Sequence, residues 1–232
     1  MVDGGASDGR TSAASGSLVI PGDFLTDSND VKAGHGVTVA GGVLFATKLG
    51  KVKVDGNTYS VRPTHTSYFP KPGDLIVGYV EGMRSNVWFI DIDAPFNAIL
   101  PMSLAPTKVE YGGTRDAMDV GTAMLARVQE VDETGSYVLT MKGMGLRKLS
   151  SGYIDTIPPH LVEDFDGLGD SVIRRIKDAS GCRIMLGANG RIWVDGSPEG
   201  ISKVGACMKF IRANRDAHDL VDRLGELLGE GE

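Results

Sequence analysis

The chain has 232 residues, of which 41% are hydrophobic and only 6% aromatic, and it contains 32 glycines. This length can bury one large core or two to three small ones, and frequent glycine with few aromatics favours small β-rich modules joined by tight turns. The formal net charge is −6 and no third of the sequence is net basic, which excludes a free-standing basic domain that wraps nucleic acid, because phosphate neutralisation supplies most of such a protein's affinity.

The first part of the chain predicts a tail followed by a small all-β domain. Residues 1–16 are rich in Gly, Ser, Ala and Asp without periodicity, as in disordered tails. Over residues 17–66, short alternating runs are broken by Gly41-Gly42 and Asp55-Gly56, which are hairpin signals. No apolar run reaches the roughly 18 residues of a membrane span and no signal segment is visible, so we expect a cytoplasmic protein without a membrane partner.

Residues 67–149 predict a five-stranded barrel of the OB type. Pro70 and Pro72 interrupt the chain, and the next segments alternate as strands: DLIVGYVEGM, NVWFIDI, FNAILP, TAMLARVQEVD and SYVLTMKG. A longer connection separates the third strand from the fourth, as in OB folds, which often hold single-stranded nucleic acid.

Residues 150–232 change in composition and predict a KH domain. A strand at YIDTI, a helix at SVIRRIKDASG, a hairpin around Asn189-Gly190 and a long helix after Ser197-Pro198 follow in that order. A KH domain has this order, and its G-x-x-G loop clamps a nucleic-acid backbone. We therefore expect a multidomain β and α+β protein.

The sequence offers no support for catalysis, a metal or a cofactor. Cys182 and Cys207 lie among apolar neighbours without metal spacing, which predicts buried, reduced thiols. The four histidines are scattered, and the Gly50-Lys51 segment lacks the other residues of a phosphate-binding loop. Asp91 and Asp93 share one face of a strand, where paired carboxylates more often face solvent than hold magnesium.

The chain resembles the archaeal exosome cap subunits that combine an N-terminal β domain, an OB domain of the ribosomal-protein type and a KH domain. The resemblance rests on VIPGDFL, YFPKPGDLIVGYV, NVWFIDIDAPFNAILP, DVGTAMLARV and SGCRIMLGANGRIWVDG in the family's order and spacing. It implies a non-catalytic subunit, present in three copies on a hexameric ring of RNase PH-type subunits. It also implies that the subunit binds single-stranded RNA, with A-rich tails preferred, and feeds 3′ ends into the ring.

One aromatic residue and four cations are the candidates for RNA binding on the barrel. In WFIDID, Trp88, Ile90 and Ile92 share one face and Phe89 lies on the other, so we assign Trp88 to the core and expect Phe89 to stack a base. The alternative for Phe89 is an aromatic buried in a domain contact. The cations predicted to line the same face, or alternatively to be ordinary solvated charges, are Lys71, Arg84, Arg127 and Lys142. Pro101 replaces a histidine that many such domains carry after the third strand.

The G-x-x-G motif of the KH domain falls on Gly167, Leu168, Gly169 and Asp170, so an aspartate replaces its second glycine. Glycines allow phosphates to approach the N–H groups at a helix N-terminus, whereas Asp170 is expected to cap the helix itself and to repel phosphate. We favour the capping role. The nearby cations, candidates for phosphate contacts or for a solvated helix face, are Arg174, Arg175, Lys177, Arg183 and Arg191.

These observations predict a non-enzymatic RNA-binding subunit of an RNA-degrading complex, anchored by its N-terminal β domain. The rival from another class is a structural adaptor that recruits proteins through Asp164–Asp170 and the acidic C-terminus. A magnesium-dependent nuclease that uses Asp91 and Asp93 is the third alternative. Only the RNA-binding hypothesis needs Phe89 and its basic neighbours.

Overall fold

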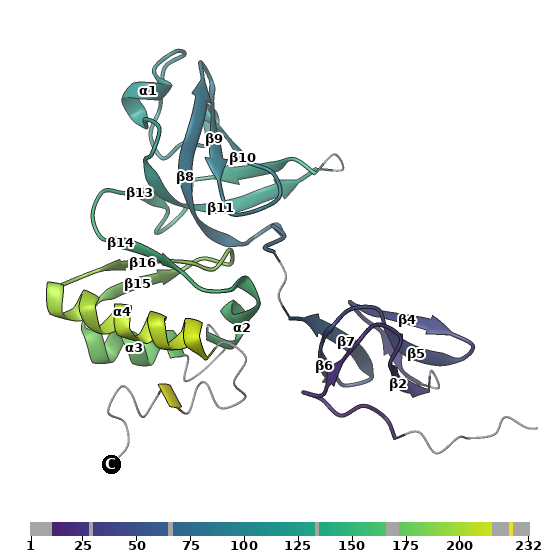
Figure 1. Cartoon of the computed structure of the whole chain (residues 1–232). Helices are drawn as coiled ribbons and strands as arrows, with labels where there is room; N and C mark the ends of the chain where they lie inside the picture. Colours follow the sequence, from purple (N-terminus) through teal and green to yellow (C-terminus); the bar gives the residue numbers. More distant parts are fainter. Residues whose placement is uncertain are drawn as a thin grey trace, which may run out of the picture. The chain divides into compact units, whose positions relative to one another are not determined.

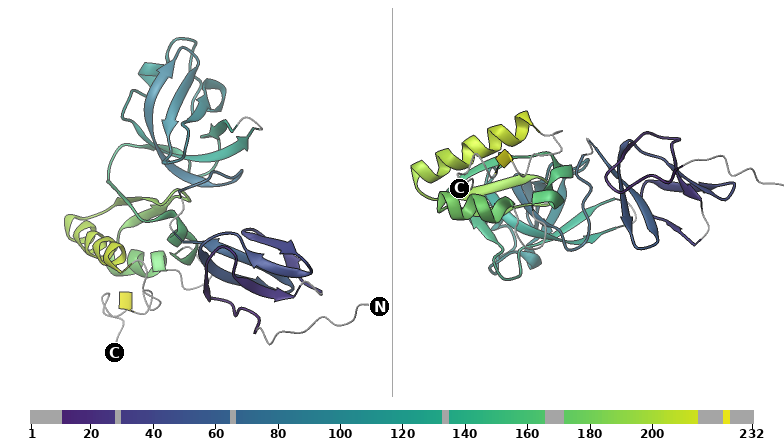
Figure 2. Two further views of the ribbon diagram at one scale, coloured as in Figure 1. Left: turned by 45° about the vertical axis from the view of Figure 1, so that its right-hand side comes forward. Right: turned by 90° about the horizontal axis from the view of Figure 1, so that it is seen from below.

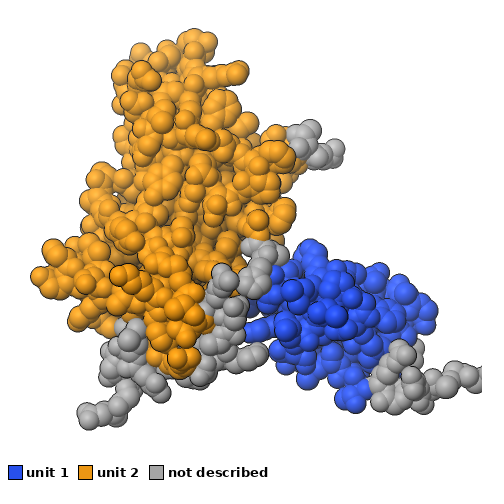
Figure 3. All heavy atoms as spheres, viewed as in Figure 1, with its two compact units in different colours: residues 1–66 blue, residues 67–232 orange. Residues whose placement is uncertain are grey.

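The protein consists of two compact units, residues 1–66 and 67–232 (Figures 1 and 3). The computed structural model describes residues 11–27, 30–64, 67–132, 135–165, 172–214 and 223–224. Within these ranges, no helix is both long enough and apolar enough to cross a membrane.

The first unit is built from two small sheets around one apolar core. The first sheet has the order β1 (Leu18–Val19), β6 (Gly50–Asp55), β7 (Thr58–Pro63), β3 (Lys32–Ala33), and the second has the order β2 (Phe24–Asp27), β5 (Val43–Ala46), β4 (Val37–Ala40). Both predicted hairpins are present, because Gly41 and Gly42 join β4 to β5 with positive φ, and Gly56, with φ +55°, lies in the turn between β6 and β7. The core contains Leu25, Leu44, Val52 and Val61.

The N-terminal segment differs in part from the predicted disordered tail. Residues 11–16 are held against this unit, since the Ala13 amide donates to the Leu25 carbonyl and the Gly16 amide to the Val52 carbonyl, each at 2.7 Å. The prediction from composition was therefore wrong for these residues, because the hydrogen bonds that hold them are made by backbone groups, which composition does not reveal. Residues 1–10 lie outside the described ranges.

The second unit begins with the predicted OB-type barrel. Its strands are β8 (Leu75–Arg84), β9 (Val87–Asp91), β10 (Ala98–Pro101), β11 (Ala123–Val131) and β12 (Tyr137–Thr140), and β13 (Arg147–Leu149) extends the sheet beside β11. The barrel closes because β12 pairs with β10 in parallel and with β11 antiparallel. The long third connection contains the 3-10 helix η1 (Met102–Leu104) and α1 (Thr114–Ala117). Trp88 is fully buried, and its indole donates to the carbonyls of Thr114 and Met118, so α1 is fixed to the barrel core as the predicted core role of Trp88 requires.

A three-stranded antiparallel sheet covered by helices follows the barrel. The elements are β14 (Tyr153–Thr156), η2 (Pro159–Leu161), α2 (Val162–Phe165), α3 (Val172–Ser180), β15 (Arg183–Leu186), β16 (Arg191–Asp195) and α4 (Pro198–Ala213), with strand order β14-β16-β15. Ser197 caps α4 by accepting from the Gly200 amide at 3.1 Å, as predicted. Figures 1 and 2 show α3 and α4 side by side on one face of this sheet, with the barrel next to the opposite face.

Candidate nucleic-acid interface

Phe89 lies on the outer surface of the barrel, at the centre of β9. The strand alternates as predicted: Trp88, Ile90 and Ile92 are fully buried, whereas Phe89 is half-buried. Its cross-strand partners on the same face are Gly82 of β8 and Ile99 of β10. Since Gly82 carries no side chain, one flank of the phenyl ring is bordered only by backbone, which leaves part of its surface available to a flat ligand.

Arg84 is the one predicted cation that reaches Phe89. Its guanidinium carbon lies 5.9 Å from the centre of the phenyl ring, within the range of a cation–π contact. The end of β8 that carries Arg84 is fixed, because the Arg84 carbonyl accepts from the Thr114 hydroxyl at 2.9 Å and the neighbouring Ser85 carbonyl accepts from the Gly112 amide at 2.9 Å. An aromatic ring and a positive charge are thus held together on rigid backbone.

Lys71 and Arg127 lie around the turn that leads into β8. The Asp74 carboxylate organises this turn by accepting from the Lys71 amide at 2.9 Å and from the Tyr68 hydroxyl at 2.8 Å. Burial, and then the hydrogen bond to Asp74, raise the pKa of Tyr68 far above its ordinary value, so the hydroxyl stays protonated as a donor. The Arg127 guanidinium donates to the Gly73 carbonyl on the other side of the same turn.

Lys142 follows the end of β12 and borders an open hollow of about 370 Å³. The hollow is formed mainly by the connection after β10, including Met102, Pro106 and Lys108. Lys108 and Lys142 are both exposed, so the rim of the hollow carries two positive charges.

The strand register relates most of these residues to one outer surface. Ile99 pairs with both Phe89 and Val138, and Arg127 pairs with Thr140, two residues along β12 from Val138. Side chains two residues apart on a strand share a face. The outer surface therefore runs from Phe89 across β10 and β12 to Arg127, while Arg84 lies at the Phe89 end.

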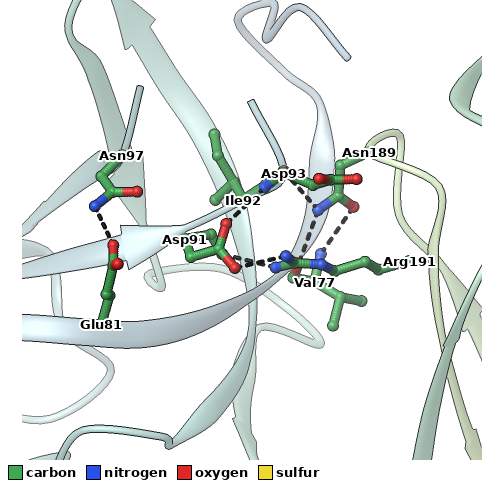
Figure 4. Close-up of polar contacts among 8 residues, drawn as sticks. All are labelled: Val77, Glu81, Asp91, Ile92, Asp93, Asn97, Asn189 and Arg191. Atoms are coloured by element: carbon green, nitrogen blue, oxygen red, sulfur yellow. Dashed lines mark hydrogen bonds and ion pairs between the residues drawn. The ribbon is translucent and has the colours of Figure 1, made fainter. Parts of the chain in front are cut away.

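Arg191 and Asp91 have a different role from the one that the sequence suggested. Arg191, expected as a phosphate contact, is buried and donates to the Asp91 carboxylate at 2.6 Å and to the Asp91 carbonyl at 2.8 Å (Figure 4). Its guanidinium also lies 5.1 Å from the centre of the Tyr79 ring. The prediction for Arg191 was wrong, because this side chain joins the three-stranded sheet to the barrel. The other Asp91 oxygen accepts from the Asp93 amide at 2.9 Å, which leaves this carboxylate poorly suited to a metal.

An intact G-x-x-G sequence, Gly187-Ala188-Asn189-Gly190, forms the tip of the predicted hairpin between β15 and β16 and docks against the barrel. The Asn189 amide nitrogen donates to the Val77 carbonyl at 2.8 Å and to the Ile92 carbonyl at 3.0 Å (Figure 4). Asn189 is only 1% exposed, so this loop is closed to a nucleic acid. The sequence analysis missed this contact, although a polar Asn in an apolar hairpin was a signal for it.

The remaining predicted residues belong to α3, to the segment before it and, for Arg183, to β15, where Arg183 is exposed and forms an ion pair with Asp195. Arg174 is exposed and lies 4.0 Å from Asp178 one turn later, while Arg175 and Lys177 are half-buried on the same helix. The predicted clamp at Gly167, Leu168, Gly169 and Asp170 lies outside the described residues. Whether α3 carries a phosphate site therefore stays a prediction.

A family model and two curated relatives that match this chain carry the same family name. Residues 18–55 match the model described as the exosome complex exonuclease RRP4 N-terminal region. The chain is 32% identical over 212 residues to the exosome complex component Rrp4 of Methanosarcina mazei, which covers 91% of this chain and 81% of the relative. It is also 32% identical over 218 residues to Rrp4 of Thermococcus kodakarensis, covering 91% of this chain and 84% of that protein.

The chain belongs to the Rrp4 family.

A solved structure agrees with this assignment. A crystal structure titled putative exosome complex RNA-binding protein superposes with a TM-score of 0.63 at 25% identity, over 71% of this chain and 97% of that one. The resemblance to archaeal exosome subunits predicted from the sequence is thus confirmed, and the barrel of this Rrp4-family member has the predicted strand topology.

The two cysteines of this Rrp4-family chain are buried, as predicted. Cys182 and Cys207 are unpaired, buried thiols, and burial raises the pKa of the Cys207 thiol. In the described ranges, no group of three or more His, Cys, Asp or Glu side chains is arranged to hold a metal ion.

Proposed function

We propose that this chain is a non-catalytic, cytoplasmic RNA-binding cap subunit of an archaeal exosome. It binds single-stranded RNA on the outer surface of the barrel and guides 3′ ends, A-rich ones by preference, into a hexameric RNase PH-type ring that carries three copies of the cap. Relatives named exosome complex component and a structural neighbour titled exosome RNA-binding protein support the class of partner.

The observation that carries the proposal is the cation–π contact between Arg84 of β8 and Phe89 of β9. Strands 2 and 3 of OB folds are the usual face for oligonucleotides, and Phe89 and Ile99 occupy the outer side of the corresponding strands. A base that stacks on a phenyl ring contributes about 1–3 kcal/mol and needs no sequence-specific hydrogen bond. Arg84 adds a positive charge beside that ring, where a phosphate or a second base edge would lie.

The balance of charge is consistent with a subunit that works within an assembly. A chain of net charge −6 gains little from long-range attraction to RNA, so its exposed cations must act locally. Three copies on one ring place three RNA-binding sites close together. Once RNA is bound at one copy, its effective concentration at the other two copies is high, which compensates for the weak affinity of a single site. The KH assignment of residues 150–232 remains part of this proposal and rests on their order of strands and helices.

Equilibrium binding of single-stranded A-rich RNA to the full chain tests the proposal. We expect Phe89→Ala to weaken binding by about 1–3 kcal/mol and Phe89→Trp to retain it, because the stacking surface is lost in the first variant only. Phe96→Ala is the matched control, since Phe96 is 66% exposed after the opposite end of β9. Equal affinities for the wild type and Phe89→Ala would refute this RNA site and favour the adaptor function.

A further inference from the structure

Two arginines from different domains converge on one tryptophan at the seam between the barrel and the three-stranded sheet. The guanidinium carbon of Arg147, on β13, lies 5.2 Å from the centre of the Trp193 ring, and that of Arg183, on β15, lies 5.8 Å from it. Trp193 is only 3% exposed and packs with Leu149 in the apolar cluster of the seam. Its indole N–H donates to the Ser151 carbonyl at 2.7 Å, so the ring that supports both arginines is fixed.

Both guanidinium groups nevertheless face solvent. Arg147 is exposed, and the side chain of Arg183 is 73% exposed although it forms an ion pair with Asp195. A guanidinium carries five N–H donors in a planar fork. Asp195 and, for Arg147, the Gly145 carbonyl at 3.2 Å engage only part of these donors. Because the contacts with Trp193 restrict the two side chains before any ligand arrives, less conformational entropy is lost when they bind one.

The seam continues the outer surface of the barrel. Arg147 pairs with Leu125 of β11, and Arg127 lies two residues along the same strand. The exposed cations therefore follow one another from Arg127 on β11 to Arg147 on β13 and then, across Trp193, to Arg183 on β15. A chain of phosphates that leaves the barrel along β11 meets the two arginines next.

We propose that Arg147 and Arg183 form a phosphate-binding site that receives the backbone of single-stranded RNA where it passes from the barrel to the three-stranded sheet. This inference rests on the proposed function and adds a second, separate place of contact to it. The guanidinium fork matches a phosphate in geometry as well as in charge, whereas the Phe89 site recognises the flat face of a base. The contribution of the Arg147–Arg183 site to RNA affinity should therefore fall as the salt concentration rises, whereas that of the Phe89 site should depend on salt much less.

The test is a salt series of RNA binding by the full chain, with the double variant Arg147→Gln/Arg183→Gln. We expect its affinity to fall about two- to fivefold per arginine, as for exposed ion pairs. The slope of log K against log salt should become shallower by about 0.7 per lost phosphate contact. Arg147→Lys/Arg183→Lys keeps the charge and should restore most of the slope. The control Lys203→Gln/Lys209→Gln removes two exposed charges from α4, on the opposite face of the sheet, and should leave the slope unchanged.

The possible outcomes separate this site from the proposed function. A salt slope that is the same in wild type and Arg147→Gln/Arg183→Gln overturns the seam site, and the proposed function survives if Phe89→Ala still weakens binding. A loss of slope equal to that of the α4 control also overturns it, because the effect is then one of net charge. Wild-type protein that binds no RNA overturns both. Thermal unfolding of each variant verifies that the domains remain folded.

Discussion

The Arg191 side chain donates to the Asp91 carboxylate at 2.6 Å and thereby links β16 of the three-stranded sheet to β9 of the barrel (Figure 4). The arginine side chain is 9% exposed and the aspartate 42%, so this ion pair is partly shielded from water. Such pairs contribute little compared with apolar packing, but removal of one partner leaves a costly unpaired charge. This contact links the two domains of the second unit. A single substitution that removes either Arg191 or Asp91 should therefore lower the stability of the protein.

Arg191→Met should destabilise the protein by about 1–3 kcal/mol, because Asp91 and the Asp91 carbonyl lose a buried donor while the apolar part of the side chain is retained. Urea unfolding followed by circular dichroism measures this change. Arg115→Met is the control, since Arg115 forms an exposed pair with Asp119 and its loss should cost less than about 0.5 kcal/mol. Equal effects of the two substitutions would mean that the contact between Arg191 and Asp91 adds nothing to stability.

Asn189→Ala should be more damaging, at about 2–4 kcal/mol, because the Val77 and Ile92 carbonyls lose donors in a buried site. Amide hydrogen exchange is the sharpest measurement, since protection should fall in β8 and β16 together. Asn86→Ala, in the exposed turn between β8 and β9, should leave exchange in β16 unaltered. Unchanged protection in Asn189→Ala would contradict the role of this side chain as a domain link.

Asp170→Gly should tighten RNA binding and slightly destabilise the predicted KH domain, residues 150–232. The sequence predicts that Asp170 occupies the place of a clamp glycine, where its charge repels phosphate and its carboxylate caps the following helix. Replacement by glycine removes the repulsion, and glycine is only a somewhat weaker cap. Binding and thermal unfolding in the same buffer measure both effects. If affinity is unchanged, the predicted clamp has no part in RNA binding.

The ion pair between Asp155 of β14 and Arg212 of α4 should make the stability of the folded protein depend on pH in the acidic range. Burial by itself raises the pKa of Asp155, but the hydrogen bonds from Arg212 and from the Thr156 amide outweigh it and hold the pKa below its ordinary value. A carboxylate whose pKa is lower in the folded state stabilises the fold above its unfolded pKa, and this contribution is lost as the pH falls through the folded pKa. Wild-type stability should therefore decline below about pH 4.

Asp155→Asn tests this dependence. The variant should unfold at a lower temperature at pH 7, and the difference from wild type should narrow as the pH falls below about 4. Asp178→Asn is the control, because Asp178 is 77% exposed in its pair with Arg174. A difference that stays constant from neutral pH to well below the ordinary aspartate pKa would show that the charge of Asp155 is not the cause.

Deletion of residues 17–66 should release the chain from the proposed ring complex without unfolding the rest. The first unit has its own core and is separated from the second at residues 66 and 67. Co-purification with ring subunits, compared between the full and the shortened chain, measures the first effect, and circular dichroism of the shortened chain measures the second. Retained co-purification would place the anchor in residues 67–232.

The sequence predicted the barrel well because its information is local and periodic. Alternation in WFIDID identified the buried face with Trp88 and the outer face with Phe89, since successive side chains on a strand point in opposite directions. The turns at Gly41-Gly42 and Asp55-Gly56 were equally local, because positive φ is a property of single residues. Strand topology followed from the number and spacing of such runs.

The seam between the domains was not predictable in this way. Alternation assigns Asp91 and Arg191 to faces, but it does not reveal which outward side chain a second domain will cover, and both were interpreted as solvent-exposed. Arg147 and Arg183 lie far apart along the chain and meet only through the folded position of Trp193. Likewise, the sequence analysis identified Asn189-Gly190 as a turn, but it did not show that this loop is buried against the barrel.

The contacts of the Asn189 loop also determine which substitutions are tolerated during evolution. Its amide nitrogen bonds to the carbonyls of Val77 and Ile92, and a backbone carbonyl is a group that every residue possesses whatever its side chain. Substitutions in the barrel that keep the backbone path therefore preserve these bonds, whereas almost any replacement of Asn189 removes them. Sequence drift should consequently be tolerated on the barrel side of the joint and resisted on the hairpin side, and a foreign barrel of the same strand path should accept this hairpin as its partner.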